Sequence, residues 1–252
     1  MSGHSKWKTN KSKKNAADAK KGAAYTKIIK EITVCAREGG GNPDINSRLR
    51  ALIAKAREEN MPSENVKMAI KRGTGEIPGI IYETVMYEAY GPGGVAIMIE
   101  ALTDNKNRTT AELRNIMSKK GGNMAGAGAV SWMFAKKGYL LIEKSKAKED
   151  ELMSISLDAG AEDFKSDDKN YEVITPAQDF EKVKQAVEAK GIQPQDAEVT
   201  MIPSSTIKVT GNEAKQVLSL IDALEEHDDV QQVYANFDIP DEILEQAASE
   251  NE

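Results

Sequence analysis

The sequence predicts an α+β fold in which an N-terminal three-helix bundle precedes two ferredoxin-like α/β plait domains, one inserted in the other. Apolar residues recur at helical spacing through the first 75 residues, whereas strand-like runs alternate with helical ones beyond residue 80. The charge changes at the same boundary. Residues 1–75 carry 17 Lys and Arg against 7 Asp and Glu, and residues 76–252 carry 17 against 33. A basic module of net charge +10 therefore precedes an acidic body of −16, which indicates binding to nucleic acid or another polyanion.

The first part of the chain is predicted to be a basic arm followed by a long helix. Residues 1–15 are polar and basic and are expected to form a flexible arm. A helix over 16–38 places its apolar residues on one side: Tyr25, Ile28, Ile29, Ile32, Cys35 and Ala36. Its cations fall on the opposite side: Lys20, Lys27, Lys30 and Arg37. The glycines at 39–41 end the helix, because glycine readily adopts the left-handed conformation.

Two shorter helices complete the predicted bundle. One runs over 47–60 and buries Leu49, Leu52, Ile53 and Ala56. The other begins near Pro62, since proline is favoured at the first helical position, and is expected to stop at Gly73. It buries Val66, Ala69 and Ile70. The glycine-rich stretch 73–79 then serves as a linker.

Beyond the linker the pattern favours strands. Runs at 82–90 and 95–102 flank a glycine turn, a helix follows at 109–120, and a glycine-rich loop covers 121–128. A strand over 129–134 places Val130, Trp132 and Phe134 on one face. Strands at 139–143, 162–165, 171–175 and 198–202, with helices at 148–159 and 176–190, then give the ferredoxin-like order βαββαβ. A helix at 213–226 and a strand at 230–234 return to complete the first plait around this second one.

These elements define the predicted domains. They are a flexible basic arm at 1–15, a helical bundle at 16–78, a discontinuous plait at 79–135 plus 204–239, an inserted plait at 136–203, and an acidic tail at 240–252.

Composition indicates a cytoplasmic protein. A hydrophobic fraction of 40% with 29% charged residues is typical of soluble globular chains. The single cysteine, Cys35, allows no internal disulfide and fits a reducing compartment. The apolar run 95–102 is too short to cross a bilayer, and no apolar segment of a secretory signal follows the basic N-terminus. We therefore expect no membrane association, no metal and no cofactor.

The basic arm is the main candidate site. Ammonium groups neutralise phosphates and release counterions, which gives salt-sensitive and sequence-tolerant binding, and a tryptophan can stack on an exposed base. A merely solvated terminus is the alternative. A membrane-surface role would need a free apolar stripe, which the first helix uses in its own bundle. The predicted nucleic-acid-binding residues are Lys6, Trp7, Lys8, Lys11, Lys13, Lys14, Lys20, Lys21, Lys27, Lys30, Arg37, Arg48, Arg50 and Arg108.

Some of these assignments have ordinary alternatives. On the second helix, four cations extend the basic surface or simply belong to a surface of mixed charge, since Glu58 and Glu59 lie close by: Arg48, Arg50, Lys55 and Arg57. Arg108 lies at a predicted strand-to-helix junction, where backbone N–H groups and cations can hold a phosphate. An ordinary helix start explains the same residues nearly as well.

Other motifs are weaker still. The loop 121–128 lacks the Gly-Lys-Ser/Thr ending of a phosphate-binding loop, which favours a flexible or closely packed loop. The cluster 225–229 offers metal-type ligands but is more typical of solvated charge. Because the only histidines, His4 and His227, belong to the arm and to this cluster, no nucleophile–histidine–acid set is apparent and no enzyme activity is predicted. The plaits lack the stacking aromatics of RNA-recognition domains and are expected to bind proteins or to position the bundle.

A series of segments resembles one family. In chain order they are Gly3-His-Ser-Lys-Trp7, Thr26-Lys-Ile-Ile-Lys-Glu31, Gly39-Gly-Gly-Asn-Pro43, Arg48-Leu-Arg50, Asn60-Met-Pro62, Tyr87-Glu-Ala-Tyr-Gly-Pro-Gly-Gly94, Thr103-Asp-Asn-Lys-Asn-Arg-Thr109, Gly121-Gly-Asn123, Ala159-Gly-Ala-Glu-Asp163, Met201-Ile-Pro203 and Asp228-Asp-Val-Gln231. Their order and spacing are similar to those of the YebC/PmpR family, whose mitochondrial relative is the translational activator of cytochrome c oxidase.

The resemblance implies three domains and a non-enzymatic role in gene expression. Two roles are known in the family: a DNA-binding transcriptional regulator, which is the leading expectation, and a factor that acts on translating ribosomes, which is the alternative. The expected partners are DNA or ribosomal RNA, with ribosomal or polymerase-associated proteins bound by the acidic plaits. No small-molecule substrate is expected.

Overall fold

The computed structural model describes residues 18–240 and 242–244, with side chains described from Gly22 onward. The described chain falls into two compact units, each formed around its own sheet. The first, here called the bundle unit, comprises residues 18–129 and 212–233. The second, here called the inserted unit, comprises residues 130–211 and 234–244. The finer domain boundaries expected from the sequence stay a prediction.

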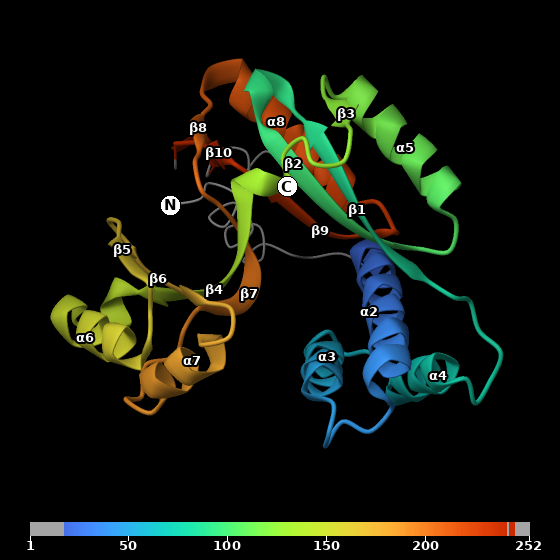
Figure 1. The fold of residues 1–252 in the computed structure, drawn as a ribbon, viewed down its shortest axis with the longest axis horizontal. Helices are drawn as coiled ribbons and strands as arrows, with labels where there is room; N and C mark the ends of the chain where they lie inside the picture. The colour runs from blue at the N-terminus through green and yellow to red at the C-terminus, as the bar shows by residue number, and fades with distance from the viewer. Residues whose placement is uncertain (1–17, 241, 245–252) are drawn as a thin grey trace. The chain divides into compact units, whose positions relative to one another are not determined.

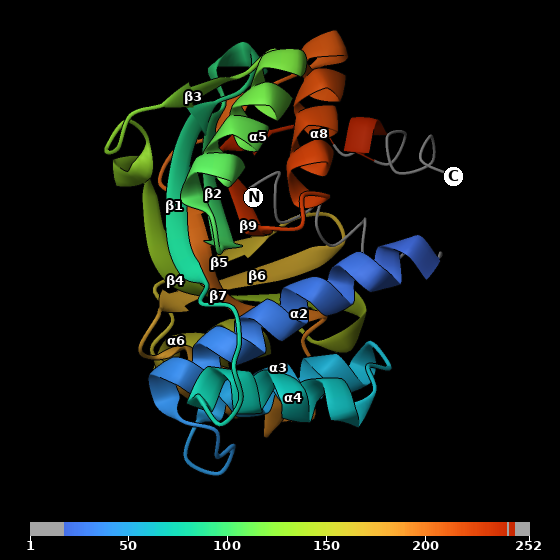
Figure 2. The ribbon, with the colours of Figure 1, turned by 90° about the vertical axis from the view of Figure 1, so that its right-hand side faces the viewer.

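Three helices open the bundle unit: α2 (Asp18–Gly39), α3 (Ser47–Glu58) and α4 (Ser63–Thr74). Helix α2 packs on the other two, as Figure 2 shows. Their shared core contains every apolar residue expected there except Ala36, which is buried without belonging to that cluster. At the start of α3, the side-chain oxygen of Asn46 accepts a hydrogen bond from the N–H of Leu49 at 3.0 Å, which caps the helix.

Gly73 has a different role from the one expected. It does not end α4, because the helix continues to Thr74 and stops at Gly75, whose φ of 79° is left-handed. A Cβ atom on Gly73 would lie 2.3 Å from the carbonyl oxygen of Thr33 and 2.8 Å from the Cβ of Ala36. Glycine is therefore required here because α4 approaches α2 so closely.

The sheet of the bundle unit has the strand order β3-β1-β2-β9. Its elements are β1 (Glu83–Tyr90), β2 (Ala96–Thr103), α5 (Lys106–Lys119), β3 (Asn123–Ala125), α8 (Gly211–Glu225) and β9 (Val230–Ala235). The central strands β1 and β2 form an antiparallel hairpin, in which Tyr87 lies opposite Ile99. Helices α5 and α8 cover one face of this sheet (Figure 2).

The inserted unit has the ferredoxin-like order predicted. Its elements are β4 (Phe134–Glu143), α6 (Glu149–Ala159), β5 (Asp163–Ser166), β6 (Asn170–Pro176), α7 (Phe180–Glu188) and β7 (Asp196–Pro203). The strands lie in the order β5-β6-β4-β7, with α6 and α7 on one side, as Figure 1 shows. Two further strands, β8 (Ile207–Lys208) and β10 (Phe237–Asp238), pair in parallel and form a separate short sheet. The α+β fold class is thereby confirmed. In the part of the chain that the model describes, no helix is both long and apolar enough to traverse a bilayer.

The prediction of a strand over 129–134 is wrong. A 3₁₀ turn occupies Ser131–Met133, and β4 begins only at Phe134. With three residues per turn, this segment loses the alternation of a strand. Trp132 is 72% exposed as a result, whereas Val130 and Phe134 are buried.

Candidate nucleic-acid interface

The polar side of α2 binds the sheet domain of its own unit. The ammonium group of Lys27 donates a hydrogen bond to the backbone carbonyl of Glu225, the last residue of α8. Near the other end of α2, the guanidinium of Arg37 donates to the carbonyl of Tyr82 at 2.8 Å. A helix C-terminus carries partial negative charge, so Lys27 is well placed against α8. These two cations therefore hold α2 in place within the bundle unit.

Lys30 lies between them and is buried. Its ammonium group donates to the carbonyl of Asp228 at 3.0 Å and to Oδ1 of Asp229 at 2.6 Å. Only 7% of Lys30 is exposed, so the expectation that it belongs to a solvent-facing basic stripe is wrong. The helical wheel located the polar side of α2 correctly. At Lys30 that side meets the loop after α8 rather than water.

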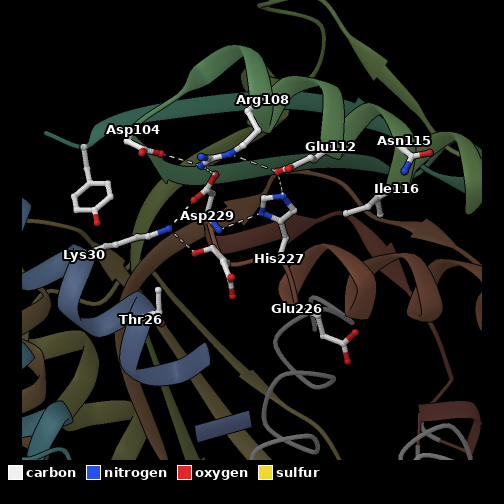
Figure 3. Close-up of a pocket in the computed structure, with 12 residues that line it drawn as sticks. Thr26, Lys30, Asp104, Arg108, Glu112, Asn115, Ile116, Glu226, His227 and Asp229 are labelled. Carbon is white, nitrogen blue, oxygen red and sulfur yellow. Dashed lines mark hydrogen bonds and ion pairs between the residues drawn. The ribbon is translucent and has the colours of Figure 1, made fainter. Parts of the chain in front are cut away.

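Asp229 is the centre of the network drawn in Figure 3. Its Oδ2 accepts hydrogen bonds from the guanidinium of Arg108 at 2.9 Å and from the hydroxyl of Thr109 at 2.6 Å. Burial alone would raise the pKa of this carboxyl. The bonds from Lys30, Thr109 and Arg108 outweigh that effect and hold the pKa well below its usual value. The reading of 225–229 as solvated charge is therefore wrong for Asp229, which is 3% exposed.

Arg108 is surrounded by carboxylates. Besides Asp229, its guanidinium contacts Asp104 at 2.9 Å and Glu112 at 3.9 Å. Hydrogen bonds to Asp229 and Asp104 raise the pKa of Arg108 further above its already high value. The side chain of Asn105 accepts from the backbone N–H of Arg108 at 3.1 Å and caps α5. The structure thus favours an ordinary helix start over a phosphate site at this junction.

A cavity of about 720 Å³ lies beside this network. On its wall, Nδ1 of His227 accepts the backbone N–H of Asp229 at 3.1 Å. The ring proton of neutral His227 therefore belongs on Nε2, which lies 2.9 Å from a carboxylate oxygen of Glu112 and donates to it. Ligand-type atoms of Glu112, His227 and Asp229 lie within 4.8 Å of one another. Both oxygens of Asp229 already accept from Lys30, Arg108 and Thr109, so this arrangement fits an ion-pair network better than a metal site.

The arginines expected on α3 have local partners. Arg48 forms an exposed ion pair with Glu38 at 3.4 Å. Arg50 donates to the backbone carbonyls of Pro43 and Asp44 at 3.0 and 2.7 Å. Both side chains remain exposed, so each can also meet a phosphate. The alternative of a surface of mixed charge describes Arg48 best.

Four other cations of the bundle are more open. Lys55 and Arg57 lie in the last turn of α3, and Lys71 and Arg72 lie in the last turn of α4. All four are exposed, and none of their side chains has a hydrogen-bond or ion-pair partner among the described residues. We call them the bundle cations. The sequence analysis did not select Lys71 and Arg72. The sequence evidence for a site there is weak, because cations are common at the C-terminal end of any helix, where they stabilise it.

The remaining candidate residues lie outside the described region. These are the arm residues Lys6, Trp7, Lys8, Lys11, Lys13 and Lys14. Lys20 and Lys21 belong to the first turn of α2, but their side chains are not described. Binding of nucleic acid by all these residues stays a prediction.

The glycine-rich loop and the cysteine have structural roles. Residues 123–125 of that loop form β3, which pairs with β1, and the N–H of Gly128 donates to the carboxylate of Glu88 at 2.7 Å. Cys35 is 2% exposed, and its thiol lies 3.5 Å from the side-chain oxygen of Asn46. Cys35 is therefore a core residue, and burial raises the pKa of its thiol, which disfavours the nucleophilic thiolate.

Comparison with known proteins identifies the family. Residues 5–76 match the model of the TACO1/YebC protein N-terminal domain, and residues 82–237 match that of the TACO1/YebC second and third domain. A protein of Syntrophobacter fumaroxidans is 55% identical over 249 residues, which cover 98% of this chain and all of the relative. One of Dictyoglomus turgidum is 56% identical over 246 residues, covering 97% and 99%. Both are named "Probable transcriptional regulatory protein".

A solved structure supports the same conclusion. It is the crystal structure of a conserved hypothetical protein, Aq1575, from Aquifex aeolicus. It is 44% identical to this chain, with a TM-score of 0.76 over 88% of this chain and 92% of that one. The chain therefore belongs to the TACO1/YebC family.

Proposed function

We propose that this protein is a non-enzymatic, cytoplasmic regulator of gene expression that binds DNA through its basic arm and helical bundle. The charge distribution carries the proposal: residues 1–75 have a net charge of +10 in a chain whose total is −6. The names of the relatives support the regulatory role. The field of so polarised a molecule directs its basic end toward a polyanion and keeps the acidic remainder away.

The contact surface is proposed from the available cations. The network around Asp229 occupies Lys30 and Arg108, and backbone carbonyls hold Lys27 and Arg37. The bundle cations have no such partners, so they and the arm lysines are the groups free to neutralise phosphates. No set of base-reading side chains stands out in the sequence, so the expected binding is sequence-tolerant and strongly salt-dependent.

Ribosomal RNA is the alternative target. Counterion release acts on either nucleic acid, and the resemblance of the sequence extends to a mitochondrial translational activator. In either case the acidic plaits would face away from the polyanion or contact basic ribosomal or polymerase-associated proteins.

Neutralising the bundle cations tests the proposed surface. Lys55, Arg57, Lys71 and Arg72 are changed together to Gln, and binding to labelled duplex DNA and to a ribosomal RNA fragment is followed by anisotropy between 50 and 200 mM salt. Each lost contact with duplex phosphate lowers the salt slope by about 0.9, so four lost contacts lower it by about 3.6.

A matched control removes the same charge from the inserted unit. Lys146, Lys148, Lys182 and Lys190 are exposed there and are changed to Gln. An equal loss of affinity in this control would show that only net charge matters, and an unchanged slope in the bundle variant would refute the surface. Ultraviolet crosslinking in growing cells, with bound DNA and RNA sequenced from one pull-down, then separates promoters from ribosomal RNA as the target.

A further inference from the structure

The sheet of the bundle unit has an incomplete border. Strand β1 pairs with β2 along its whole length, but β3 pairs only with its last three residues, Glu88 to Tyr90. Over residues 83–87, β1 therefore forms the border of the sheet, as Figure 2 shows. We call this stretch the open edge, because no strand of the described chain continues β3 along it.

Two residues of the open edge turn their backbone groups away from β2. Thr84 lies opposite Leu102, whose N–H donates at 2.8 Å to the carbonyl of Asp229, just before β9 on the other side of β2. Thr84 and Leu102 are thus a non-hydrogen-bonded pair, and such pairs recur at every second residue, so Met86 has the same direction. The N–H and C=O groups of Thr84 and Met86 point outward, and none of them has a partner among the described residues.

The open edge is accessible and partly apolar. Glu83, Thr84 and Met86 are exposed, and the exposed fraction of Met86 is 44%. The chain just before β1 adds two exposed apolar side chains, since Ile80 is 55% and Ile81 is 73% exposed. Native proteins usually block an uncovered edge with a charged side chain or a proline, and residues 84–86 include neither. Such an edge is a template for a further strand.

Helix α5 places two cations beside this edge. Thr110 marks the side of α5 that faces β1, because its hydroxyl oxygen lies 3.1 Å from that of Tyr87. Lys106 and Arg114 come one turn before and one turn after Thr110, so they share its side of the helix. Both are exposed, and neither side chain has a partner among the described residues. The border is therefore locally basic, although residues 76–252 carry a net charge of −16.

We propose that the open edge binds an extended peptide of a partner protein, in which apolar residues alternate with acidic ones. The peptide adds a strand to the sheet through the outward backbone groups of Thr84 and Met86. Tyr87 points toward α5, so Met86 points to the opposite face, and apolar peptide residues paired with Thr84 and Met86 lie on that face too. The peptide residue between them points to the α5 side, where a carboxylate meets Lys106 and Arg114.

This partner site is separate from the proposed nucleic-acid surface. It uses the border of the sheet and one side of α5, whereas nucleic-acid binding is proposed for the arm and the bundle cations. All the tests below are made without nucleic acid, so failure of the peptide site would leave the proposed function standing, and failure of nucleic-acid binding would leave the peptide site standing.

Amide hydrogen exchange of the full chain, followed by NMR, tests whether the edge is open. In the free protein the N–H groups of Thr84 and Met86 should exchange fast, whereas those of Val85 and Tyr87, which point to β2, should be protected. Protection of Thr84 and Met86 in the free protein would overturn the proposal. Protection that grows with protein concentration would assign the edge to a second copy, and protection that does not would assign it to the chain itself.

The probe is a peptide of seven residues that alternates valine and glutamate. Its glutamates are N-methylated, so its outer edge cannot pair with further strands. At 100 times its Kd the peptide should slow exchange at Thr84 and Met86 about a hundredfold, because only the unbound fraction exchanges. A peptide that leaves both amides unprotected would overturn the proposal.

Peptide variants separate strand addition from non-specific attraction. Moving the N-methyl groups from the glutamates to the valines removes the donors that face β1, so binding measured by fluorescence anisotropy should be lost. A peptide that alternates valine and lysine keeps the backbone but reverses the charge beside α5, and it should bind more weakly. Equal affinity of the two N-methylated forms would refute strand addition, and equal affinity of the two charge forms would refute the acidic preference.

Protein variants test the two sides of the site. Lys106→Gln with Arg114→Gln should weaken the valine–glutamate peptide about fivefold, the effect of losing two charge pairs of surface strength. Lys55→Gln with Arg57→Gln removes the same charge from α3 as the control, and equal losses in both would overturn the role of α5. Met86→Pro removes an outward N–H without breaking the ladder to β2, so binding should be lost. Met86→Lys blocks the same edge with a charge and decides the question if the proline variant does not fold, and unchanged binding would overturn the proposal.

Discussion

Replacing Lys30 with Met tests whether the buried ion pair holds α2 in place. The ammonium group of Lys30 lies 2.6 Å from Oδ1 of Asp229, and the two side chains are only 8% and 5% exposed. Methionine keeps most of the aliphatic stem and removes the charge, so the change isolates the pair rather than the packing.

The expected loss is large for a single lysine. Breaking a buried pair by removing one partner costs about 3–5 kcal/mol. Because Arg108 and Thr109 still bind the other oxygen of Asp229, we expect the lower end, about 3 kcal/mol. At about 2–4 °C per kcal/mol for a protein of this size, Tm should fall by about 6–12 °C.

Thermal unfolding of a double-mutant cycle measures the pair itself. The variants are Lys30→Met, Asp229→Asn and both together, and the coupling energy should be about 2 kcal/mol. Lys67→Met is the control, since Lys67 forms an exposed pair with Glu64 at 3.5 Å that is worth no more than about 0.5 kcal/mol. The reasoning is refuted if Lys30→Met costs no more than Lys67→Met, or if the two changes in the cycle are simply additive.

Two further predictions concern stability. Because the pKa of Asp229 is lower in the folded protein than in the unfolded chain, its stabilisation is complete above about pH 5 and is lost as the pH falls. The free energy of unfolding, measured with urea between pH 7 and pH 2, should therefore fall less steeply with acid in Asp229→Asn than in the unsubstituted protein. An identical fall would contradict this account. Gly73→Ala should cost at least about 1–3 kcal/mol, because its Cβ would meet the carbonyl of Thr33 at 2.3 Å. Gly22→Ala in α2, with nothing within 4 Å, should instead stabilise by up to about 1 kcal/mol, and equal effects would refute the packing argument.

The sequence predicted the features that depend on local pattern. The apolar stripes of the three N-terminal helices are buried as expected, and βαββαβ is the order of the inserted unit. The predictions were wrong where the role of a residue depends on a segment far away in the sequence. A wheel shows that Lys30 is on the polar side of α2, but its partner Asp229 is 199 residues away. The role of Gly73 likewise depends on the path of α2, which no periodicity in α4 records.

The candidate site was less predictable for the same reason. The sequence made Arg108 a candidate phosphate ligand, because nothing in it indicates that this side chain binds Asp229, 121 residues later. To predict the bundle cations as a site, one must know which side chains remain without partners. That follows only from the folded geometry.

The insertion also sets an order of assembly on the ribosome. The sheet of the bundle unit needs β9, which begins at Val230, yet β3 ends at Ala125. At about 5–20 residues per second, the final strand is synthesised about 5–20 s after its three partners. The inserted unit has its own core and a nearly contiguous sequence, so it can fold during that delay. A truncation before Val230 should therefore leave an incomplete sheet beside a finished plait. Asp229 emerges only just before that strand, so α2 receives its buried partner among the last steps of synthesis.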